Sequence, residues 1–268
     1  MIRIYTKYNH SIQDVKIMTT KIFAHRGASM LAPENTMDSF ELAYQMGAEG
    51  IETDVHLTKD KVPILIHDET INRTTNGYGY VKDYTFAQLQ SLDAGSWFAK
   101  KYSGASLISL EEFLLWAKPK PFYLNIELKN NKIDYKHLET IVYEMLNHFE
   151  ILDRTIISTF NAKSLQRMKK LNQQVDKALL TSKNYRNLIK RAIELDVNAV
   201  HIKYSTLKTK LVERANQEDI AIRVYTVNKP IKMIRCFARG CHGIFTDIPD
   251  RGLKYRKLYQ NNYLGEST

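Results

Sequence analysis

Charged side chains follow directly after short apolar segments at several points in this chain of 268 residues. The segment "IFAHRG" places His25 and Arg26 after three apolar residues, and "PILIHD" leads into a second histidine, His67. Histidine is the side chain most often used for proton transfer, and arginine suits a bound phosphate oxygen. Together, these residue types indicate chemistry at a phosphate group.

Three carboxylates are expected to meet beside these groups. Side chains two residues apart on a strand share a face, so Glu52 and Asp54 in "GIETDV" point the same way. In "YLNIELK", Asn125, Glu127 and Lys129 alternate in the same manner. Carboxylates this close cannot all remain charged without a positive partner, and a hard cation with oxygen ligands is the natural one. We therefore expect Mg²⁺ or Ca²⁺ at the carboxylates, and the residue types do not choose between the two ions.

Each of these positions also has a structural interpretation when it is taken alone. A histidine at a strand end is often a hydrogen-bonded structural residue, and Glu127 and Lys129 could simply pair with each other. Asn228 and Asp247, at the ends of two later apolar segments, could be loop or helix caps. We favour the functional interpretation because all of these residues fall at the same end of successive predicted strands. His201 lies within its predicted strand, and we expect the other histidines to be structural or solvated: His10, His56, His137, His148 and His242.

The candidate residues lie on an alternation of predicted strands and helices. We expect strands at Ile22–His25, Gly50–Leu57, Val62–His67, Tyr123–Leu128, Thr155–Phe160, Lys177–Thr181, Ala199–Ile202, Ile220–Val227 and Gly243–Thr246. Helical patterns lie between most of them, at Thr36–Met46, Tyr135–Phe149, Ala162–Leu171, Arg186–Leu195, Lys208–Glu218 and Pro230–Arg239. Strands separated by helices form a parallel sheet.

The second and third predicted strands are too close in sequence for a helical crossover. We therefore expect a hairpin that turns at residues 60–61, a register that would place Asp54 opposite His67. Removing the return strand leaves eight parallel strands, which favours an α/β fold of the (β/α)₈ or TIM-barrel type over an open doubly wound sheet. In such barrels the chemistry takes place at the C-terminal ends of the strands, where the polar residues lie.

The chain is expected to be a single barrel domain, residues 21–268, preceded by an N-terminal extension, residues 1–20. Residues 68–107 are rich in turn signals and predict a small insertion after the hairpin. The N-terminus lacks a continuous apolar region and a cleavage site, and no run of about 18 apolar residues occurs. With only two cysteines, Cys236 and Cys241, this pattern indicates a cytoplasmic protein with free thiols.

The formal net charge is +10, with most Lys and Arg residues on predicted helices. A solvated outer face accounts for this pattern, and a field of this sign would attract anionic ligands and favour peripheral contact with an anionic membrane. No basic strip interleaved with aromatic residues and no zinc pattern is present, so we expect no nucleic-acid partner. The sequence makes no prediction of oligomeric state.

Seven motifs resemble, in order, those of the glycerophosphodiester phosphodiesterases. They are "AHRGASMLAPENTMDSF", "GIETDVHLTKDKVPILIHDETINRTTNGYG", "LDAGSWF", "LEEFL", "NIELK", "YTVN" and "GIFTDIP". The resemblance implies a (β/α)₈ barrel that hydrolyses glycerophosphodiesters to sn-glycerol 3-phosphate and an alcohol, in glycerol and lipid metabolism. In the family mechanism, the glycerol 2-hydroxyl attacks phosphorus and water then opens the cyclic phosphate.

The resemblance also implies a role for eight residues. These are the ligands of a divalent cation, Glu52, Asp54 and Glu127; the general base and acid, His25 and His67; and the substrate-binding residues Arg26, Lys129 and Tyr225. The residue types and their positions at strand ends support the same roles, but they do not assign which histidine is the base.

Three positions depart from the family pattern. Lys61 stands where the hairpin usually has glycine, and Ile108 stands where proline is common. Tyr225 replaces the usual tryptophan close to the substrate, so we expect altered contact with the glycerol moiety or the head group. Every metal and histidine position of the family is kept.

Two other functions stay as alternatives. A lysophospholipase D-type enzyme would act on lipids at a membrane surface, and four aromatic residues could give the insertion an apolar rim: Tyr78, Tyr80, Trp97 and Phe98. A barrel that only binds a ligand would have no need for paired acid–base groups, which argues against it.

Overall fold

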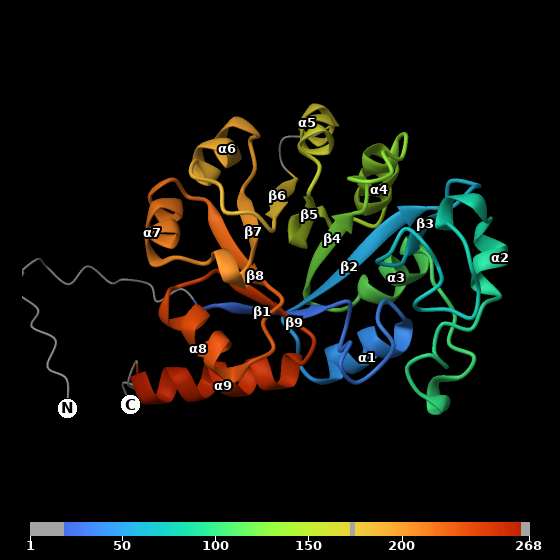
Figure 1. Cartoon of the computed structure of the whole chain (residues 1–268), viewed down its shortest axis with the longest axis horizontal. Helices are drawn as coiled ribbons and strands as arrows, with labels where there is room; N and C mark the ends of the chain where they lie inside the picture. The colour runs from blue at the N-terminus through green and yellow to red at the C-terminus, as the bar shows by residue number, and fades with distance from the viewer. Residues whose placement is uncertain (1–18, 172–174, 264–268) are drawn as a thin grey trace, which may run out of the picture.

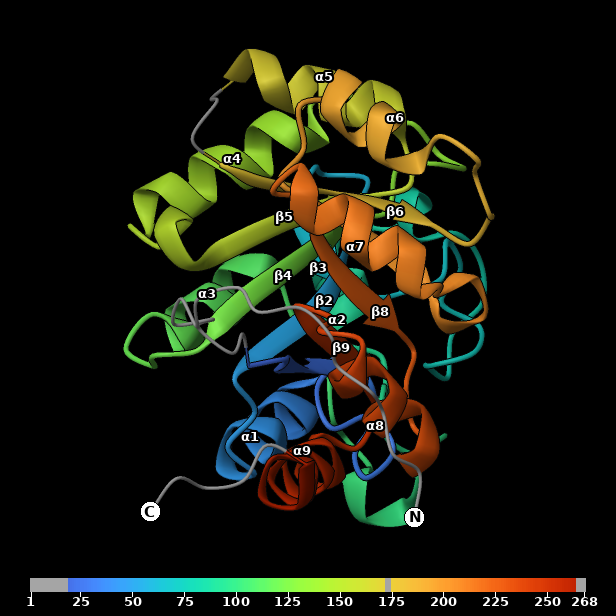
Figure 2. The same cartoon turned by 90° about the vertical axis from the view of Figure 1, so that its left-hand side faces the viewer.

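The computed structural model describes residues 19–171 and 175–263. Within them, eight parallel strands form a closed barrel with helices around it (Figures 1 and 2), which confirms the predicted (β/α)₈ fold. The barrel strands are β1 (Lys21–His25), β2 (Gly50–Leu57), β4 (Tyr123–Leu128), β5 (Thr155–Thr159), β6 (Asp176–Thr181), β7 (Ala199–Lys203), β8 (Ala221–Tyr225) and β9 (Gly243–Thr246). Pairing of β1 with both β2 and β9 closes the ring.

The helices that cover the barrel follow its strands in turn. They are α1 (Met37–Gln45), α3 (Leu110–Ala117), α4 (Leu138–His148), α5 (Ala162–Leu171), α6 (Leu188–Glu194), α7 (Thr209–Gln217), α8 (Pro230–Ala238) and α9 (Pro249–Tyr263). All six predicted helical patterns are confirmed, with ends that differ by up to three residues. The helices α3 and α9 were not predicted.

Of the two unpredicted helices, α3 has a clear sequence signal and α9 has a weak one. Ser109 and Glu112 form a reciprocal capping box at the start of α3, a recognisable signal for a helix. The helix α9 has few apolar residues; some of them, such as Leu253, pack against the core, and polar contacts add to this packing. Arg256 Nη1 donates to the Thr20 carbonyl at 2.7 Å and to Glu49 Oε2 at 2.5 Å.

The interior of the barrel is filled at its N-terminal end by aromatic side chains. The rings of Phe23 and Phe245 lie 5.2 Å apart, and both residues are buried. Phe23 also fixes a glycine in the neighbouring strand, because a Cβ atom at Gly50 would meet its ring at 2.3 Å. These two rings, with Ile156, Ala178 and Ala199, make an apolar floor beneath the polar residues at the other end of the strands.

The predicted hairpin is present, but its register was predicted wrongly. The strand β3 (Pro63–Leu65) runs antiparallel to β2, with Val55 opposite Leu65. This register sets Asp54 opposite Ile66 rather than His67, and Ile66 N donates to the Asp54 carbonyl at 3.1 Å.

The cause of the shift is a loop of three residues, 59–61, in place of two. Thr58 N donates to the Val62 carbonyl, and Lys61 N donates to the Thr58 carbonyl, each at 3.1 Å. Lys61 has a φ of 66°, the left-handed conformation that closes three-residue hairpins of this kind. Lysine therefore occupies a position whose backbone favours glycine.

Residues 68–107 form a largely irregular segment with one short α-helix, α2 (Phe86–Gln90). It has a small core of its own, made by Ile64, Ile66, Ile71, Val81, Leu89, Ala94 and Leu107. Its description as an insertion stays a prediction, and nearly all of the predicted N-terminal extension lies outside the described residues. Cys236 and Cys241 are buried free thiols. In the part of the chain that the structure describes, no helix is both long and apolar enough to cross a membrane.

The strained position in the hairpin gives a stability prediction. Replacing Lys61 by glycine should raise the free energy of unfolding by about 1 kcal/mol, because a left-handed backbone disfavours residues with a Cβ atom. Lys59→Gly in the same exposed loop is the matched control, since Lys59 has no positive φ. It should lower the free energy of unfolding by up to about 1 kcal/mol. Urea denaturation measures both, and equal effects of the two changes would contradict the assignment.

Candidate active site

The eight predicted site residues come together at the C-terminal ends of the barrel strands. A cavity of about 190 Å³ opens there, and seven of the eight line it: His25, Arg26, Glu52, His67, Glu127, Lys129 and Tyr225. The eighth, Asp54, is buried beside them. The barrel therefore gathers residues that lie as far apart in sequence as His25 and Tyr225.

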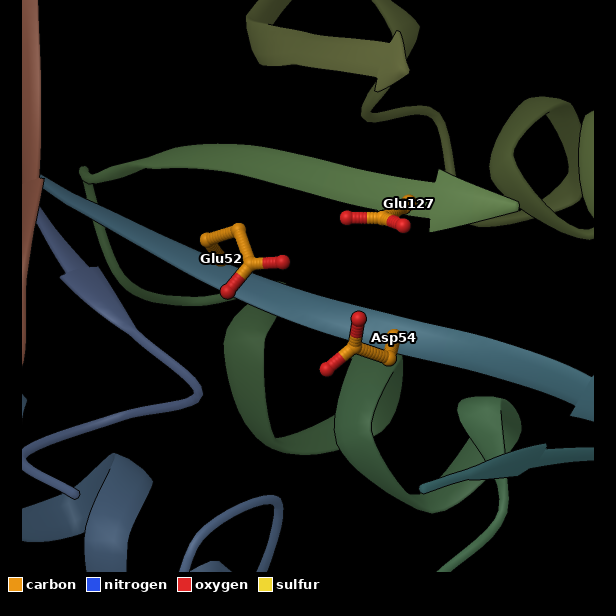
Figure 3. A group of neighbouring side chains, drawn as sticks. All are labelled: Glu52, Asp54 and Glu127. Atoms are coloured by element: carbon orange, nitrogen blue, oxygen red, sulfur yellow. The ribbon is translucent and has the colours of Figure 1, made fainter. Parts of the chain in front are cut away.

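Three carboxylates face one another at this end of the barrel (Figure 3). Glu52 and Asp54 extend from β2 and Glu127 from β4, and one oxygen of each lies within 4.8 Å of the others. All three are buried, and Asp54 Oδ1 is a buried atom without a hydrogen-bond partner. Buried acidic oxygens that converge, one of them without a donor, fit a hard divalent cation, as the sequence predicted.

Two cations partly offset this concentration of negative charge. Lys129 Nζ lies 2.8 Å from Glu127 Oε1 and 3.6 Å from Asp54 Oδ1. Arg26 Nε lies 3.2 Å from Asp54 Oδ2. Arg26 and Lys129 also line the cavity, so the same cations that stabilise the carboxylates face the space where a ligand would bind.

The three carboxylates are not electrostatically equivalent. Burial raises the pKa of Glu52 well above the usual range, and the negative charges of Asp54 and Glu127 raise it further. Burial alone would also raise the pKa of Asp54, but Arg26 and Lys129 together hold it below its usual range. Glu52 is therefore the carboxylate for which a bound cation would make the largest difference.

The backbone after β1 is shaped around these carboxylates. Arg26 has a φ of 57°, and its N–H donates to the Glu52 carbonyl at 3.0 Å and to Glu52 Oε2 at 2.9 Å. Asn35, also in a left-handed conformation, donates from Nδ2 to Asp54 Oδ2 at 3.0 Å. Thr36 is the N-cap of α1, which leaves Asn35 to orient a carboxylate.

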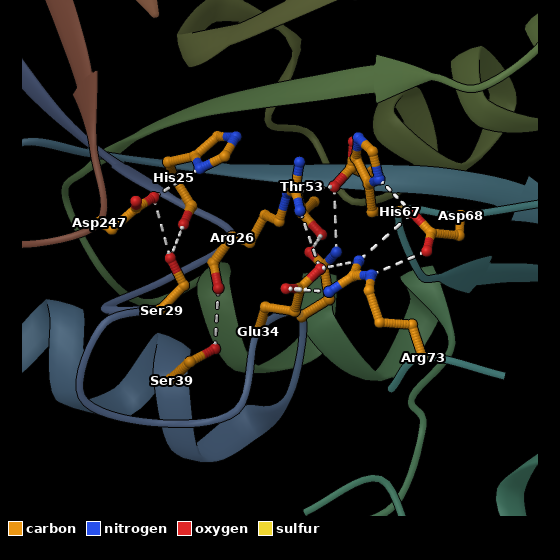
Figure 4. Close-up of polar contacts among 12 residues, drawn as sticks. His25, Arg26, Ser29, Glu34, Ser39, Thr53, His67, Asp68, Arg73 and Asp247 are labelled. Atoms are coloured by element: carbon orange, nitrogen blue, oxygen red, sulfur yellow. Dashed lines mark hydrogen bonds and ion pairs between the residues drawn. The ribbon is translucent and has the colours of Figure 1, made fainter. Parts of the chain in front are cut away.

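Each of the two histidines is held by an aspartate (Figure 4). His25 Nδ1 lies 2.7 Å from Asp247 Oδ1, and His67 Nδ1 lies 2.6 Å from Asp68 Oδ1. Asp247 is held in turn by Ser29 Oγ at 3.1 Å and Asn228 Nδ2 at 2.5 Å. These contacts engage Nδ1 of both rings, and the structure shows no protein partner for Nε2 of either ring among the described residues.

Asp68 belongs to a second chain of ion pairs that reaches the cavity from the opposite side (Figure 4). Arg73 Nε donates to Asp68 Oδ2 at 2.8 Å, and its Nη1 and Nη2 donate to the two oxygens of Glu34 at 2.7 and 2.8 Å. Glu34 also accepts from Arg26 Nη1 at 2.9 Å. Glu34 is thus engaged by two guanidinium groups and is not one of the three converging carboxylates.

Several supporting residues were missed or left open by the sequence. Asp68 and Asp247 lie at strand ends as expected, but their pairing with the histidines could not be predicted, and Arg73 carried no signal at all. His56, which we expected to be structural or solvated, is structural. Its Nε2 lies 3.1 Å from the His67 carbonyl and its Nδ1 lies 2.9 Å from the Tyr135 hydroxyl. Burial lowers the pKa of His56 to about 4.

The cavity wall also carries polar atoms that lack partners. Asn125 Oδ1, His201 Nδ1 and the Tyr225 hydroxyl are buried without a hydrogen bond, although all three residues line the cavity. Unpaired buried polar atoms are rare in proteins, and at a cavity they indicate a polar ligand. His201, which lies within its strand as predicted, has its ring centroid 4.9 Å from that of Phe245, and it lines this same cavity.

Comparison with known proteins agrees with this geometry. Residues 25–251 match the glycerophosphoryl diester phosphodiesterase family. A Bacillus altitudinis protein named glycerophosphodiester phosphodiesterase is 40% identical over 241 residues, covering 89% of this chain and 98% of the relative. A protein of the same name from Caldanaerobacter subterraneus is 36% identical over 233 residues, covering 87% of this chain and 96% of the relative.

Solved structures give the same result. A phosphodiesterase from Oleispira antarctica, in complex with the product sn-glycerol-3-phosphate, superposes with a TM-score of 0.85 at 28% identity. The match covers 89% of this chain and 97% of that chain. A glycerophosphodiester phosphodiesterase from Agrobacterium tumefaciens gives a TM-score of 0.77 at 27% identity, covering 88% of this chain and 99% of that chain.

The converging carboxylates predict a measurable cation affinity. Isothermal titration calorimetry with Mg²⁺ and with Ca²⁺ should show one site, and Glu127→Gln should weaken it by about tenfold or more, because one charged oxygen ligand is lost. Glu49→Gln, just before β2 at the opposite end of the barrel, is the control and should leave the affinity unchanged. Equal affinities in the two variants would remove Glu127 from the site.

The raised pKa of Glu52 predicts how stability depends on pH. Without a cation, the chain should lose stability as the pH rises from the ordinary glutamate range, about 4.3, through the raised pKa of Glu52. Glu52→Gln should weaken this loss and stabilise the EDTA-treated chain at neutral pH by about 1 kcal/mol or more. Urea denaturation at several pH values measures this, and a destabilised variant at neutral pH would refute the assignment.

Proposed function

The chain belongs to the glycerophosphoryl diester phosphodiesterase family, and from this premise we propose that it hydrolyses glycerophosphodiesters to sn-glycerol 3-phosphate and an alcohol with the help of a divalent cation. One observation carries the proposal. The cavity at the mouth of the barrel holds two carboxylate-bound histidines, His25 and His67, around a group of three buried carboxylates. This is an acid–base pair arranged around a cation site.

Glu52, Asp54 and Glu127 would hold the cation, which when bound neutralises charge on the phosphoryl oxygens. Arg26 and Lys129 then bind the phosphate from the cavity wall. The Tyr225 hydroxyl has no hydrogen-bond partner among the described residues, which supports its role as a donor to the substrate. Tyr225 packs against the apolar floor, so this contact would lie at that side of the cavity.

The two histidines would move protons in opposite directions. One takes the proton of the glycerol 2-hydroxyl as its oxygen attacks phosphorus, and the other protonates the departing alcohol as the bond from phosphorus to its oxygen breaks. In the second step, water attacks the cyclic phosphate, the bond from phosphorus to the 2-oxygen breaks, and the protons return. Each ring has its Nδ1 held by aspartate, so Nε2 is the atom that exchanges protons.

The surroundings of the two aspartates favour His25 as the first base. Besides His25, the side chain of Asp247 contacts neutral donors, Ser29 and Asn228. The negative charge of Asp247 is therefore not shared with a second cation, and it stabilises His25 when that ring takes up a proton. Asp68 shares its charge with Arg73, which suits His67 for giving a proton away. This assignment goes beyond the sequence, which left the two roles open.

A second candidate substrate class is favoured by the exposed aromatic residues of the insertion. Tyr78 is 77% exposed, Tyr80 is 50% exposed and Trp97 is 39% exposed, which would suit a lysophospholipid acyl chain at a membrane surface. Soluble head-group diesters assayed beside lysolipids, with and without divalent cation, separate the two classes. A cytoplasmic location and a role in glycerol and lipid metabolism stay predictions.

The mechanism predicts the effects of chelation and of losing either histidine. EDTA should abolish hydrolysis of glycerophosphocholine, and Mg²⁺ or Ca²⁺ should restore it. His25→Ala and His67→Ala should each lower kcat by about 10² or more, the range for lost general acid–base catalysis. His148→Ala, on an outer helix, is the control and should keep full activity. Activity that persists in EDTA would contradict the proposed role of the cation. An unchanged kcat in either alanine variant would exclude that histidine from the mechanism.

A further inference from the structure

The helices α6 and α7 lie next to each other on the outside of the barrel (Figure 1). A strongly basic groove is formed by residues of these two helices and of the loops that lead into them. It has a volume of about 450 Å³. Five exposed cations line it, and we call this set the basic groove: Lys183, Arg186, Lys208, Lys210 and Arg214. No acidic residue lines it, and none of the five forms a salt bridge with another residue in the described part of the chain.

The charge at this groove is unusual for the molecule. Residues 183–214 carry eight Lys or Arg and three Asp or Glu, so this segment holds +5 of the chain's net +10. Some cations elsewhere on the surface have partners: Arg167 pairs with Asp134 and Glu139, and Arg256 pairs with Glu49. Like charges gathered without counterions repel one another, so the free groove is electrostatically unfavourable and attracts anions.

The position of the groove connects it to the active site. Leu180, in β6, lines the catalytic cavity, and Lys183 lines the groove three residues later. Their Cα atoms are therefore no more than about 11 Å apart. Lys183 N donates to Thr181 Oγ1 at 3.1 Å, which fixes the turn between them. A ligand held at the carboxylates could thus extend into the groove.

We propose that the basic groove binds a second phosphate group, carried by the alcohol portion of the substrate. This proposal rests on the proposed function and deepens it, because it makes substrates with an additional phosphate the preferred ones. Lysine supplies compact point charges and arginine a fork of donors, and both suit the oxygens of a phosphate monoester. A lipid surface fits less well, since the exposed aromatic residues that would enter it, such as Tyr78 and Tyr80, lie on the insertion.

Two substrates that differ by one phosphate test the proposal. They are glycerophosphoglycerol and the same compound with a phosphate monoester on its leaving glycerol. The wild-type chain should show a kcat/KM ratio of about ten in favour of the phosphorylated compound, as expected for charge-assisted hydrogen bonds. Raising the salt concentration should lower this ratio, because the cations are exposed. A ratio of one at low salt would overturn the proposal.

The double variant Lys208→Ser, Lys210→Ser should bring the ratio close to one. The matched control is Lys170→Ser, Lys254→Ser, which removes the same charge from exposed positions on α5 and α9 and should keep the wild-type ratio. An unchanged ratio in the groove variant would overturn the proposal. Loss of binding to phosphatidylglycerol vesicles with an unchanged ratio would also overturn it, in favour of a membrane surface.

Failure of the groove and failure of the proposed function give different results. If neither compound is hydrolysed, the proposed function is wrong, and calorimetric binding of both compounds to a His67→Ala chain still tests the groove. In that background the phosphorylated compound should bind about tenfold more tightly. The added changes Lys208→Ser and Lys210→Ser should remove the difference. Equal affinities before those changes would contradict a second phosphate site.

Discussion

Mutual repulsion among three buried carboxylates is the constraint on which the rest of the site depends. Glu52, Asp54 and Glu127 lie on neighbouring strands with oxygens within 4.8 Å, where burial reduces screening by water. Arg26 and Lys129 offset part of the charge, and the raised pKa of Glu52 shows that the compensation is incomplete. The site thus carries negative charge that Arg26 and Lys129 do not fully neutralise. A divalent cation would neutralise the remainder, at the point where a phosphate would bind.

The supporting contacts extend this balance of charge outward. Arg26 is tied to Glu34, Glu34 to Arg73, and Arg73 to Asp68, so a single chain of ion pairs joins the loop after β1 to the segment that follows β3. At its end, Asp68 orients His67. His67 and the converging carboxylates are therefore positioned by one set of alternating charges, because Arg26 also contacts Asp54, whereas Asp247 holds His25 separately.

Much of this arrangement could be predicted from the sequence, because period-two spacing places Glu52 with Asp54 and parallel strands bring their C-terminal ends together. The partners of the histidines could not, since His25 and Asp247 are 222 residues apart and only the closed barrel makes them neighbours. The hairpin register failed because it depends on the left-handed conformation of Lys61. The helix α9 was missed because its few apolar residues form no clear helical stripe, and polar contacts supplement their packing against the core.

The apolar floor made by Phe23 and Phe245 has a consequence for turnover. It closes the barrel beneath the cavity, so substrate enters and both products leave through the same mouth. In the binding orientation that we propose, with the glycerol unit toward Tyr225 and the floor, the alcohol would lie nearer the mouth and would depart first. Glycerol 3-phosphate would then be the last product to leave, and it would occupy the site that the next substrate needs. Accumulated product would slow the enzyme by competition, which makes its rate responsive to how quickly that product is consumed.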